Sequence, residues 1–542
     1  MISETLQPEE TVNADALQSA RILFPHTQQG KVYLNHAGTA PMCTRVVEAI
    51  TAHLHERSAG MIETSMTKDV AKIEECRRLV ARLIHAESPD RIALMTNTSD
   101  PINVVAVGLK WKSGDRIVLH EAEFPANVWP YRALKSHGVE IDVIPQRDGH
   151  PTAERIAKAI TPRTRLVALS AVQFLTGYRA DLEAIGSLCR SRGILFVVDG
   201  IQAAGAVELD VQRMKIDALA SGCQKWQLAP QGTGWLYITE ELQQRIQPVF
   251  VGWLAVEDPW DFFNSNQPLA SSARMFEGGT RNIPGLYGLA AALEVLLSFG
   301  ATQIERRILN LTRMLLDGLS QIPGVQAITP DADHERAGIL TIELPPSTNA
   351  KLVFRTLLKQ NITVAVREGK LRYAPHFYNT AQEMTFAIEA TREALHHSSS
   401  THGGNMFNPI DMVSDMKKGP TILLIDDNED FREALKHLLL SHGYRVCEAG
   451  NGEHALEMMH VEAPDLAIVD LDMPKMNGIE FSRRVKKDWP GFPILMVTAY
   501  SQFYSTKEVL AAGIDAFLQK PIDGDKLLEV IQQLPMPAKK EG

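Results

Sequence analysis

The sequence predicts two α/β domains of unequal size, joined by a polar linker, and three observations carry this prediction. From about residue 22, short apolar runs such as "RIALMT", "TRLVALSAV" and "GILFVVDG" alternate with amphipathic helical stretches, a pattern typical of a parallel α/β sheet. The stretch 396–419, "HHSSSTHGGNMFNPIDMVSDMKKG", is polar and weakly periodic, as linkers are. After it the alternation restarts on a smaller scale in "TILLIDD", "DLAIVDLD", "PILMVTAY" and "DAFLQKP".

We therefore expect a larger domain over residues 22–396, a linker over 397–418 and a smaller domain over 419–537. The net charge of −10 gives no support for nucleic-acid binding. The five cysteines are scattered without a C-x-x-C pair, which favours reduced thiols in a cytoplasmic protein. The first residues are acidic and polar, and no run of 18 apolar residues occurs, so we expect neither a signal peptide nor a membrane partner.

In the larger domain, one lysine and one acid follow predicted strands, where open α/β sheets bind their ligands. Lys225 lies in "SGCQKWQLAPQGTG", a segment with little other charge, just past the apolar run "IDALA". A lysine at such a place reaches water with its amine or takes part in chemistry with a lowered pKa. Asp199 ends the run "FVVDG", and Gln202 follows three residues later.

Three further segments of this domain offer an anion site and a flat aromatic surface. In "MTNTSDPINVVAVGL" a strand, a hydroxyl-rich turn and a helix follow one another, so free backbone N–H groups and the hydroxyls of Thr98 and Ser99 can cradle a phosphate. Phe124 follows another strand in "EAEFPANVWPY", and Thr280 lies among glycines in "FEGGTRN". Phosphate donors, a carboxylate, a stacking ring and a lysine together describe a site for pyridoxal 5'-phosphate (PLP).

These segments also resemble a known family. The stretch from about Tyr33 to His397 is similar to the class V aminotransferases, which are fold-type I PLP-dependent enzymes with a large parallel-rich sheet domain and a small α+β subdomain. The matching segments occur in the family's order: "VYLNHAGTAP", "NTSDPIN", "EFPAN", "VDGIQAAG", "CQKWQLAPQGTGWLY", "FEGGTRNIPGLYGL" and "LRYAPHFYNT".

The resemblance implies a role for each of these residues. Lys225 would bind the aldehyde of PLP covalently and Asp199 would pair with the pyridine nitrogen, which makes these two the catalytic residues. Arg372 would clamp the α-carboxylate of an amino-acid substrate, and Asn35 would also contact substrate. Other cofactor contacts are implied for Thr98 and Ser99 (phosphate), Phe124 (ring stacking), Gln202 (phenolic oxygen), Gln224 (phosphate) and Thr280, the last reaching from the neighbouring subunit of a homodimer.

At two places the sequence differs from the family pattern, and these differences reduce the number of reactions that we expect. Gln224 stands immediately before the lysine where many members have histidine, so this position can hydrogen-bond but not titrate. The cysteine desulfurase branch has a stacking histidine where Phe124 stands, and a cysteine-bearing loop before the arginine. Here "ITVAVREGKLRYAP" runs to Arg372 without a cysteine. The sequence therefore disfavours cysteine desulfurase and leaves transaminase, epimerase and β-lyase chemistry open.

In the smaller domain, polar side chains end four predicted strands. Asp426 and Asp427 end the first, Asp470 another, Thr498 a third, and Lys520 follows the fourth. If the strands are parallel, these groups meet at one edge of the sheet. Three carboxylates at one place repel each other unless a cation lies among them, and Mg²⁺ suits such a site.

This pattern resembles the receiver domain of bacterial response regulators, with a flavodoxin-like (βα)5 fold, from about Pro420 to Leu534. The resemblance implies that Asp470 accepts a phosphoryl group from a sensor histidine kinase or a phosphotransfer protein of a two-component phosphorelay. The carbonyl of Asp472 would join the carboxylates around Mg²⁺. Thr498, Phe517 and Lys520 would form the switch.

For the whole chain, the leading hypothesis is a PLP-dependent enzyme acting on an amino acid, with activity or association regulated by phosphorylation of the receiver domain. The alternative is a signalling or scaffold protein, in which the receiver is a phosphate sink or docking module and the larger domain is a non-catalytic dimer. Lys225, Asp199 and Arg372 favour the enzyme. The substrate and the direction of regulation cannot be predicted from these residues.

Overall fold

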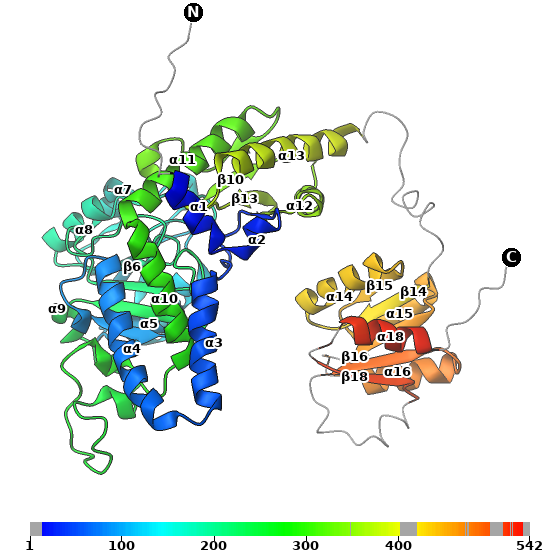
Figure 1. The fold of residues 1–542 in the computed structure, drawn as a ribbon, viewed down its shortest axis with the longest axis horizontal. Helices are drawn as coiled ribbons and strands as arrows, with labels where there is room; N and C mark the ends of the chain where they lie inside the picture. Colours follow the sequence, from blue (N-terminus) through cyan, green and yellow to red (C-terminus); the bar gives the residue numbers. More distant parts are fainter. Residues whose placement is uncertain are drawn as a thin grey trace, which may run out of the picture. The chain divides into compact units, whose positions relative to one another are not determined.

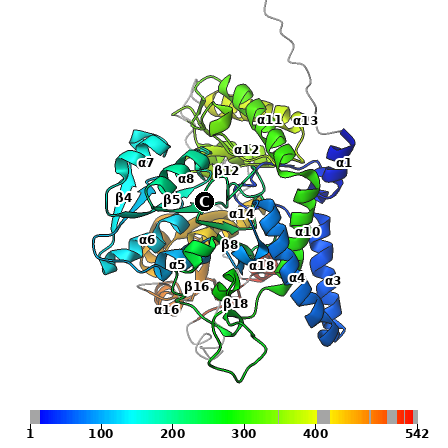
Figure 2. The ribbon, with the colours of Figure 1, turned by 90° about the vertical axis from the view of Figure 1, so that its left-hand side faces the viewer.

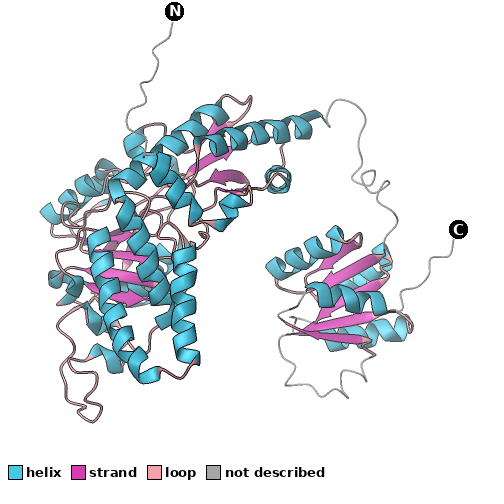
Figure 3. Cartoon of the chain, viewed as in Figure 1, coloured by secondary structure: helices cyan, strands magenta, loops and turns pink. Residues whose placement is uncertain are grey.

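The structure, a computed structural model, describes residues 14–346, 348–400, 420–471, 473, 476–498, 513–520, 522 and 524–534. The chain divides into two compact units, residues 1–403 and 404–542. Both are α/β units (Figures 1 and 3), so the predicted fold class is confirmed.

The larger unit is built around a seven-stranded sheet (Figure 3). All neighbouring strands are parallel except β8, which runs antiparallel to both β2 and β7. The sequence pattern indicated a parallel sheet, but the connection from β7 to β8 is too short for a crossover helix, and a short connection favours an antiparallel return. In order across the sheet the strands are β2 (Ile92–Met95), β8 (Gly234–Ile238), β7 (Ala218–Gly222), β6 (Leu195–Asp199), β5 (Thr164–Ser170), β3 (Arg116–His120) and β4 (Glu140–Ile144).

Both faces of this sheet are buried, which explains why its strands read as continuous apolar runs. Alternate residues of one strand enter different cores: Phe196 and Val198 lie in one, and Leu195 and Val197 in the other. Helices α3, α4 and α10 lie side by side in both views (Figures 1 and 2). The helices of this part are α1 (Ala14–Ile22), α2 (Pro25–Gln28), α3 (Thr44–Ser58), α4 (Ile62–Leu83), α5 (Ser99–Gly108), α6 (Trp129–Ala133), α7 (Ala153–Ala159), α8 (Leu182–Ser191), α9 (Glu240–Gln243) and α10 (Ile283–Phe299).

A second, antiparallel sheet belongs to the same unit and has its own hydrophobic core. Its order is β12 (Ala365–Arg367), β13 (Lys370–Tyr373), β10 (Leu340–Glu343) and β9 (Gln326–Ala327), with helices α11 (Ala301–Ser320), α12 (Ala350–Lys359) and α13 (Ala381–Ser400). The short strand β1 (Val32–Tyr33) pairs in parallel with β11 (Ile362–Thr363). This pairing continues as a bridge between Asn35 and Ala374, so the N-terminal segment lies beside the end of β13.

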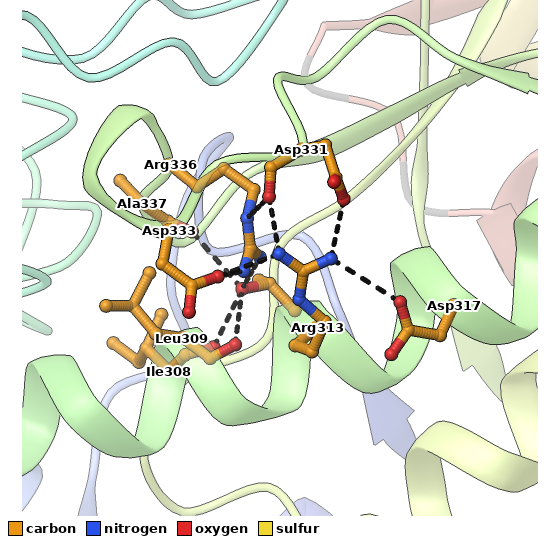
Figure 4. Close-up of polar contacts among 9 residues, drawn as sticks. Ile308, Leu309, Arg313, Asp317, Asp331, Asp333, Arg336 and Ala337 are labelled. Carbon is orange, nitrogen blue, oxygen red and sulfur yellow. Dashed lines mark hydrogen bonds and ion pairs between the residues drawn. The ribbon is translucent and has the colours of Figure 1, made fainter. Parts of the chain in front are cut away.

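A charged network fixes the segment that leads into β10 (Figure 4). Arg313 on α11 contacts Asp331 at 2.6 Å and Asp333 at 2.8 Å. The buried Arg336 side chain also contacts Asp333, and its Nη1 donates to the Thr312 hydroxyl at 3.2 Å. These contacts anchor the chain before β10, the strand that pairs with β13.

The smaller unit has a five-stranded parallel sheet. Its strand order, in which the first strand lies between the second and third, is that of flavodoxin-like folds, and ligands bind there at the carboxyl ends of the strands. The strands are β15 (Arg445–Ala449), β14 (Thr421–Ile425), β16 (Leu466–Asp470), β17 (Ile494–Thr498) and β18 (Ala516–Gln519), and the helices are α14 (Glu429–Ser441), α15 (Gly452–Glu462), α16 (Gly478–Asp488) and α18 (Gly524–Gln533).

Across the described residues, no helix taken alone has the length and apolar character needed to cross a membrane. Helices α10 and α11 reach the required length and apolar character only when they are taken together, and the chain bends by 80° at the break between them. Much of α10 is buried in the core of the larger unit.

Candidate active site

Lys225 lies just beyond β7, and its amine is held inside the larger unit. The Nζ atom is 5.6 Å from the centroid of the Phe124 ring. Burial lowers the pKa of Lys225 to about 8; the charge of Asp199 opposes this shift, whereas Arg372 and Arg367 add to it. A lysine with this pKa has an appreciable fraction of free amine at neutral pH, as a nucleophile toward an aldehyde requires.

Asp199 ends β6 and is 2% exposed. Its Oδ1 accepts a hydrogen bond from the Ile201 backbone N–H at 3.0 Å, while the buried Oδ2 has no partner. Burial raises the pKa of Asp199 to about 6, against the opposing effects of the Ile201 hydrogen bond and of Lys225. A buried carboxylate oxygen that receives no hydrogen bond is suited to accept one from a protonated ring nitrogen.

Gln202 is buried just after the end of β6, three residues beyond Asp199. Its Nε2 donates to the Ala37 carbonyl at 3.0 Å, and its Oε1 accepts from the Trp226 indole at 2.9 Å. The side chain therefore ties the residue after Lys225 to the N-terminal segment. The sequence analysis predicted only a contact between Gln202 and a cofactor oxygen. The structure adds the hydrogen bonds of Gln202 to Ala37 and Trp226.

The start of α5 lies against the end of β7. The Thr98 hydroxyl accepts a hydrogen bond from the Gly222 N–H at 2.9 Å. A Cβ at Gly222 would lie 2.7 Å from Oε1 of Gln224 and 3.2 Å from Oγ1 of Thr98, so both side chains lie close to this glycine. Ser99 opens the helix and is half-buried. Thr98, Ser99 and Gln224 are thus gathered at a helix N-terminus, a suitable place for a phosphate group.

Phe124 has a 41% exposed side chain and packs edge-to-face on Phe174 at 5.3 Å between centroids. The residue before it, Glu123, is a buried acid that sequence reasoning missed. Its two oxygens accept from the Ser170 N–H at 3.0 Å, the Ser170 hydroxyl at 2.5 Å, and the Asn127 amide at 2.9 Å. Burial raises the pKa of Glu123 to about 7. Glu123 therefore joins β5 to the segment that carries Phe124.

Arg372 lies on β13 and is 2% exposed. Its Nη1 donates to the Phe174 carbonyl at 2.6 Å, and its Nε is buried without a partner. Within the part of the chain that the structure describes, no carboxylate lies within ion-pair distance of this guanidinium. Burial, with a further contribution from Arg367, lowers its pKa to about 10. The Asn35 Oδ1 atom is likewise buried without a partner, next to the bridge with Ala374.

Thr280 lines a cavity of about 560 Å³ together with Thr96, Asp100 and Asn103. Asn103 also lines a neighbouring surface pocket beside Ser99 and Phe124. Thr280 therefore lies near the start of α5, and its reach into a neighbouring subunit stays a prediction.

In the smaller unit, the acids converge as predicted. Carboxylate oxygens of Asp426, Asp427 and Asp470 lie within 4.8 Å of one another. The Lys520 amine lies 2.7 Å from Asp426 and 3.2 Å from Asp470. Burial raises the pKa of Asp470, and Lys520 opposes this shift.

The remaining switch residues lie on adjacent strands of the same sheet. Thr498 ends β17 and is buried, and Phe517 on β18 has a 39% exposed side chain. Strands β17 and β18 pair in parallel, with Thr498 opposite Gln519, the residue before Lys520. Asp472 lies outside the described residues.

Comparison with known proteins identifies both units. The class V aminotransferase family model matches residues 32–396, and the response regulator receiver domain model matches residues 422–532. The chain belongs to the class V aminotransferase family and carries a C-terminal receiver domain, so the larger unit is a PLP-dependent class V aminotransferase-like domain.

The relatives differ in their named activities. A probable cysteine desulfurase of Methanothermobacter thermautotrophicus is 29% identical over 383 residues, covering 67% of this chain and 94% of that protein. Isopenicillin N epimerase of Streptomyces clavuligerus is 30% identical over 378 residues, covering 66% and 94%. Two structures of C-DES cover 68–69% of this chain and 99% of theirs at 25% identity, with TM-scores of 0.63 and 0.62. One is a mutant with glycine covalently linked to the PLP cofactor, and the other is a complex of this cystine C–S lyase with its product, cysteine persulfide.

The residues of this chain fit PLP. The partnerless Oδ2 of Asp199 suits the ring nitrogen, the amine of Lys225 suits the aldehyde, and the Thr98 end of α5 suits the phosphate. Phe124 presents an exposed ring 5.6 Å from the lysine amine, which would suit stacking on a flat cofactor ring.

Proposed function

We propose that the larger domain is a PLP-dependent enzyme acting at the α-carbon of a free amino acid, and that phosphorylation of the receiver domain adjusts its activity. The observation that carries the first part is Arg372. A buried guanidinium with an unpartnered Nε and no carboxylate partner among the described residues suits an incoming α-carboxylate, which accepts two parallel N–H bonds. The positive charge of Arg372 also lowers the pKa of Lys225, which supports assigning the two residues to one site.

Each residue has a separate task in this proposal. Asp199 would hold the ring nitrogen of PLP, Phe124 would cover one face, and Thr98, Ser99 and Gln224 would hold the phosphate. Bound there, PLP draws electrons away from the substrate α-carbon. Arg372 and Asn35 would fix the orientation of the amino acid. Lys225, with its pKa near 8, would then remove the α-proton at Nζ and return it.

The proposed reaction uses no protein thiol. Cys43, Cys76, Cys189 and Cys223, the cysteines of the larger domain, are fully buried, and burial raises the pKa of each. Because the thiolate is the nucleophilic form, these residues are poorly suited to take a sulfur atom from a substrate. This supports aminotransfer, epimerisation or β-elimination over protein-persulfide formation, although several relatives and solved structures similar to this chain are named cysteine desulfurases.

Product analysis distinguishes these reactions. The full chain loaded with PLP is incubated with a panel of amino acids in D2O, and the products are followed by NMR. A keto acid with an amino acceptor indicates aminotransfer, deuterium at an inverted α-carbon indicates epimerisation, and a keto acid with a released side-chain group indicates β-elimination. Lys225→Ala should lose every activity, and the control Lys215→Ala, at an exposed lysine, should keep it. If no amino acid reacts or changes the cofactor absorbance, the alternative of a non-catalytic scaffold is favoured.

We also propose that the acid cluster binds Mg²⁺ and that Asp470 accepts phosphate from a histidine kinase or phosphotransfer protein. The three carboxylates and the nearby Lys520 support this, because a divalent cation and a lysine together neutralise a phosphoryl group. Acetyl phosphate with Mg²⁺ should phosphorylate the full chain, and Asp470→Asn should not react. Identical kinetics and oligomeric state before and after phosphorylation would contradict regulation.

A homodimer is the assembly that we propose. Large apolar side chains are exposed on α3 and α4, among them Val47, Leu54, Met66 and Val70. Phe250, which lines the cavity that holds Thr280, is also exposed. Such surface suits a protein partner. Light scattering of the full chain tests this proposal, and a monomer at all concentrations would refute it.

A further inference from the structure

A second arginine, Arg367, lies on the same face of the antiparallel hairpin as Arg372. The register of β12 and β13 places Ala365 opposite Arg372 and Arg367 opposite Lys370. Residues opposite one another in an antiparallel pair share a face, and so do residues two apart along a strand. Arg367 and Arg372 are therefore diagonal neighbours.

The turn between the two strands is short and well defined. Glu368 and Gly369 both have positive φ, 47° and 72°, as a two-residue hairpin turn of type I′ requires. Arg367 is thus presented from the end of a regular strand rather than from a long loop. Residues 362–375, which include this hairpin, contain no cysteine.

Arg367 has no acid to neutralise it among the residues that the structure describes. Its side chain is exposed, and its Nη1 donates to the carbonyl of its own neighbour, Val366, at 2.9 Å. Lys370, which faces the same side of the hairpin, is paired with Glu343 at 2.9 Å. The charge of Arg367 is felt inside the site, because it lowers the pKa of both Lys225 and Arg372.

The substrate end of the site therefore contains three cationic side chains, Lys225, Arg372 and Arg367, whereas Asp199 is directed to the cofactor ring in the proposed function. One α-carboxylate on Arg372 leaves Arg367 without a partner. A second carboxylate would remove the remaining repulsion, and the guanidinium fork suits carboxylates in particular.

We infer that Arg367 binds a second carboxylate on the side chain of the substrate, so that the enzyme acts on acidic α-amino acids. This inference rests on the proposed function, since it takes Arg372 as the partner of the α-carboxylate. Arg367 is a specificity-determining residue in this account and takes no part in proton transfer.

The test compares aspartate and glutamate with alanine as probes on the full PLP-loaded chain. The measured quantities are the dissociation constant, from the change in cofactor absorbance, and kcat/KM wherever turnover occurs. Wild type should prefer at least one acidic amino acid over alanine. Arg367→Gln should lower that preference about tenfold, through weaker binding of the acidic amino acids, whereas the alanine values should change less. The matched control is Lys370→Gln, which removes a cation from the same face of the hairpin and should leave the preference unchanged.

The outcomes separate this inference from the proposed function. If no amino acid perturbs the cofactor of the wild type, the proposed function fails and the inference fails with it. If alanine binds as well as the acidic amino acids, or if Arg367→Gln keeps the preference, the inference alone is overturned. A thermal unfolding curve checks that the variant folds, and the exposure of Arg367 leads us to expect an unchanged Tm.

Discussion

Asp199 and Lys225 stabilise each other's charged forms inside a buried site. Burial raises the pKa of Asp199 to about 6 and lowers that of Lys225 to about 8, and each residue opposes the shift of the other. At neutral pH the site therefore holds a largely ionised acid together with a lysine that is partly free amine.

The first prediction concerns the pH dependence of cofactor capture. Only the free amine of Lys225 attacks an aldehyde, so the rate at which the PLP-free protein takes up PLP should rise about tenfold per pH unit below pH 8 and level off above it. Stopped-flow absorbance between pH 6.5 and 9.5 measures this rate. A rate still rising steeply at pH 9.5 would mean that the lysine keeps its ordinary pKa.

The second prediction concerns stability without the cofactor. The folded-state pKa of Asp199 lies above its ordinary value, so its ionisation opposes folding once the pH rises through the interval from about 4 to 6. Asp199→Asn should therefore stabilise the PLP-free protein at pH 7 by up to about 3 kcal/mol, and the difference should vanish near pH 4. Denaturant unfolding at both pH values measures it.

Asp317→Asn is the control for this measurement, because Asp317 is an exposed partner of Arg313 and should show no comparable gain. An Asp199→Asn protein that is no more stable than wild type at pH 7 would contradict the buried, unpartnered environment of the carboxylate.

The third prediction concerns Glu123. Glu123→Ala leaves the Ser170 N–H and the Asn127 amide without their acceptor in a buried place, and should destabilise the protein by roughly 3 kcal/mol or more. Glu123→Gln keeps an acceptor for the Ser170 N–H and should cost about 1 kcal/mol. Urea unfolding of the PLP-free protein compares the two, and equal stability of both variants would refute the role of these hydrogen bonds.

The fourth prediction concerns Arg372. Arg372→Lys keeps the positive charge but loses the planar fork, so kcat/KM for the best amino acid should fall about a hundredfold, mainly through KM. Arg355→Lys, at an exposed position of α12, should stay within about twofold of wild type. Equal losses in the two variants would point to general damage rather than to substrate contact.

Some features of the site could be predicted from the sequence because they depend on local pattern. Lys225, Asp199 and Asp470 each lie at or just beyond the end of a strand whose apolar run is easily recognised, and the carboxyl ends of such strands meet at one edge of a sheet. The direction of β8 could not be predicted in the same way, because the apolar pattern of a buried strand is the same for both directions.

Other features depend on contacts between distant segments. Glu123 reads as an ordinary acid after a strand, and only the approach of β3 to β5 buries it against Ser170. The link from Gln202 to Ala37 and the face shared by Arg367 and Arg372 likewise depend on tertiary pairing. A signal for Arg367 did exist, since "REGK" is a two-residue turn sequence that places its flanking residues opposite one another.

The central claim is that Lys225 is the residue that holds PLP, and reductive trapping tests it most directly. The full chain is loaded with PLP, treated with borohydride and digested, and the modified peptide is sequenced by mass spectrometry. The account predicts one phosphopyridoxyl group, on Lys225, and none in Lys225→Ala. A label on another lysine, or no label in a protein that binds PLP, would contradict it.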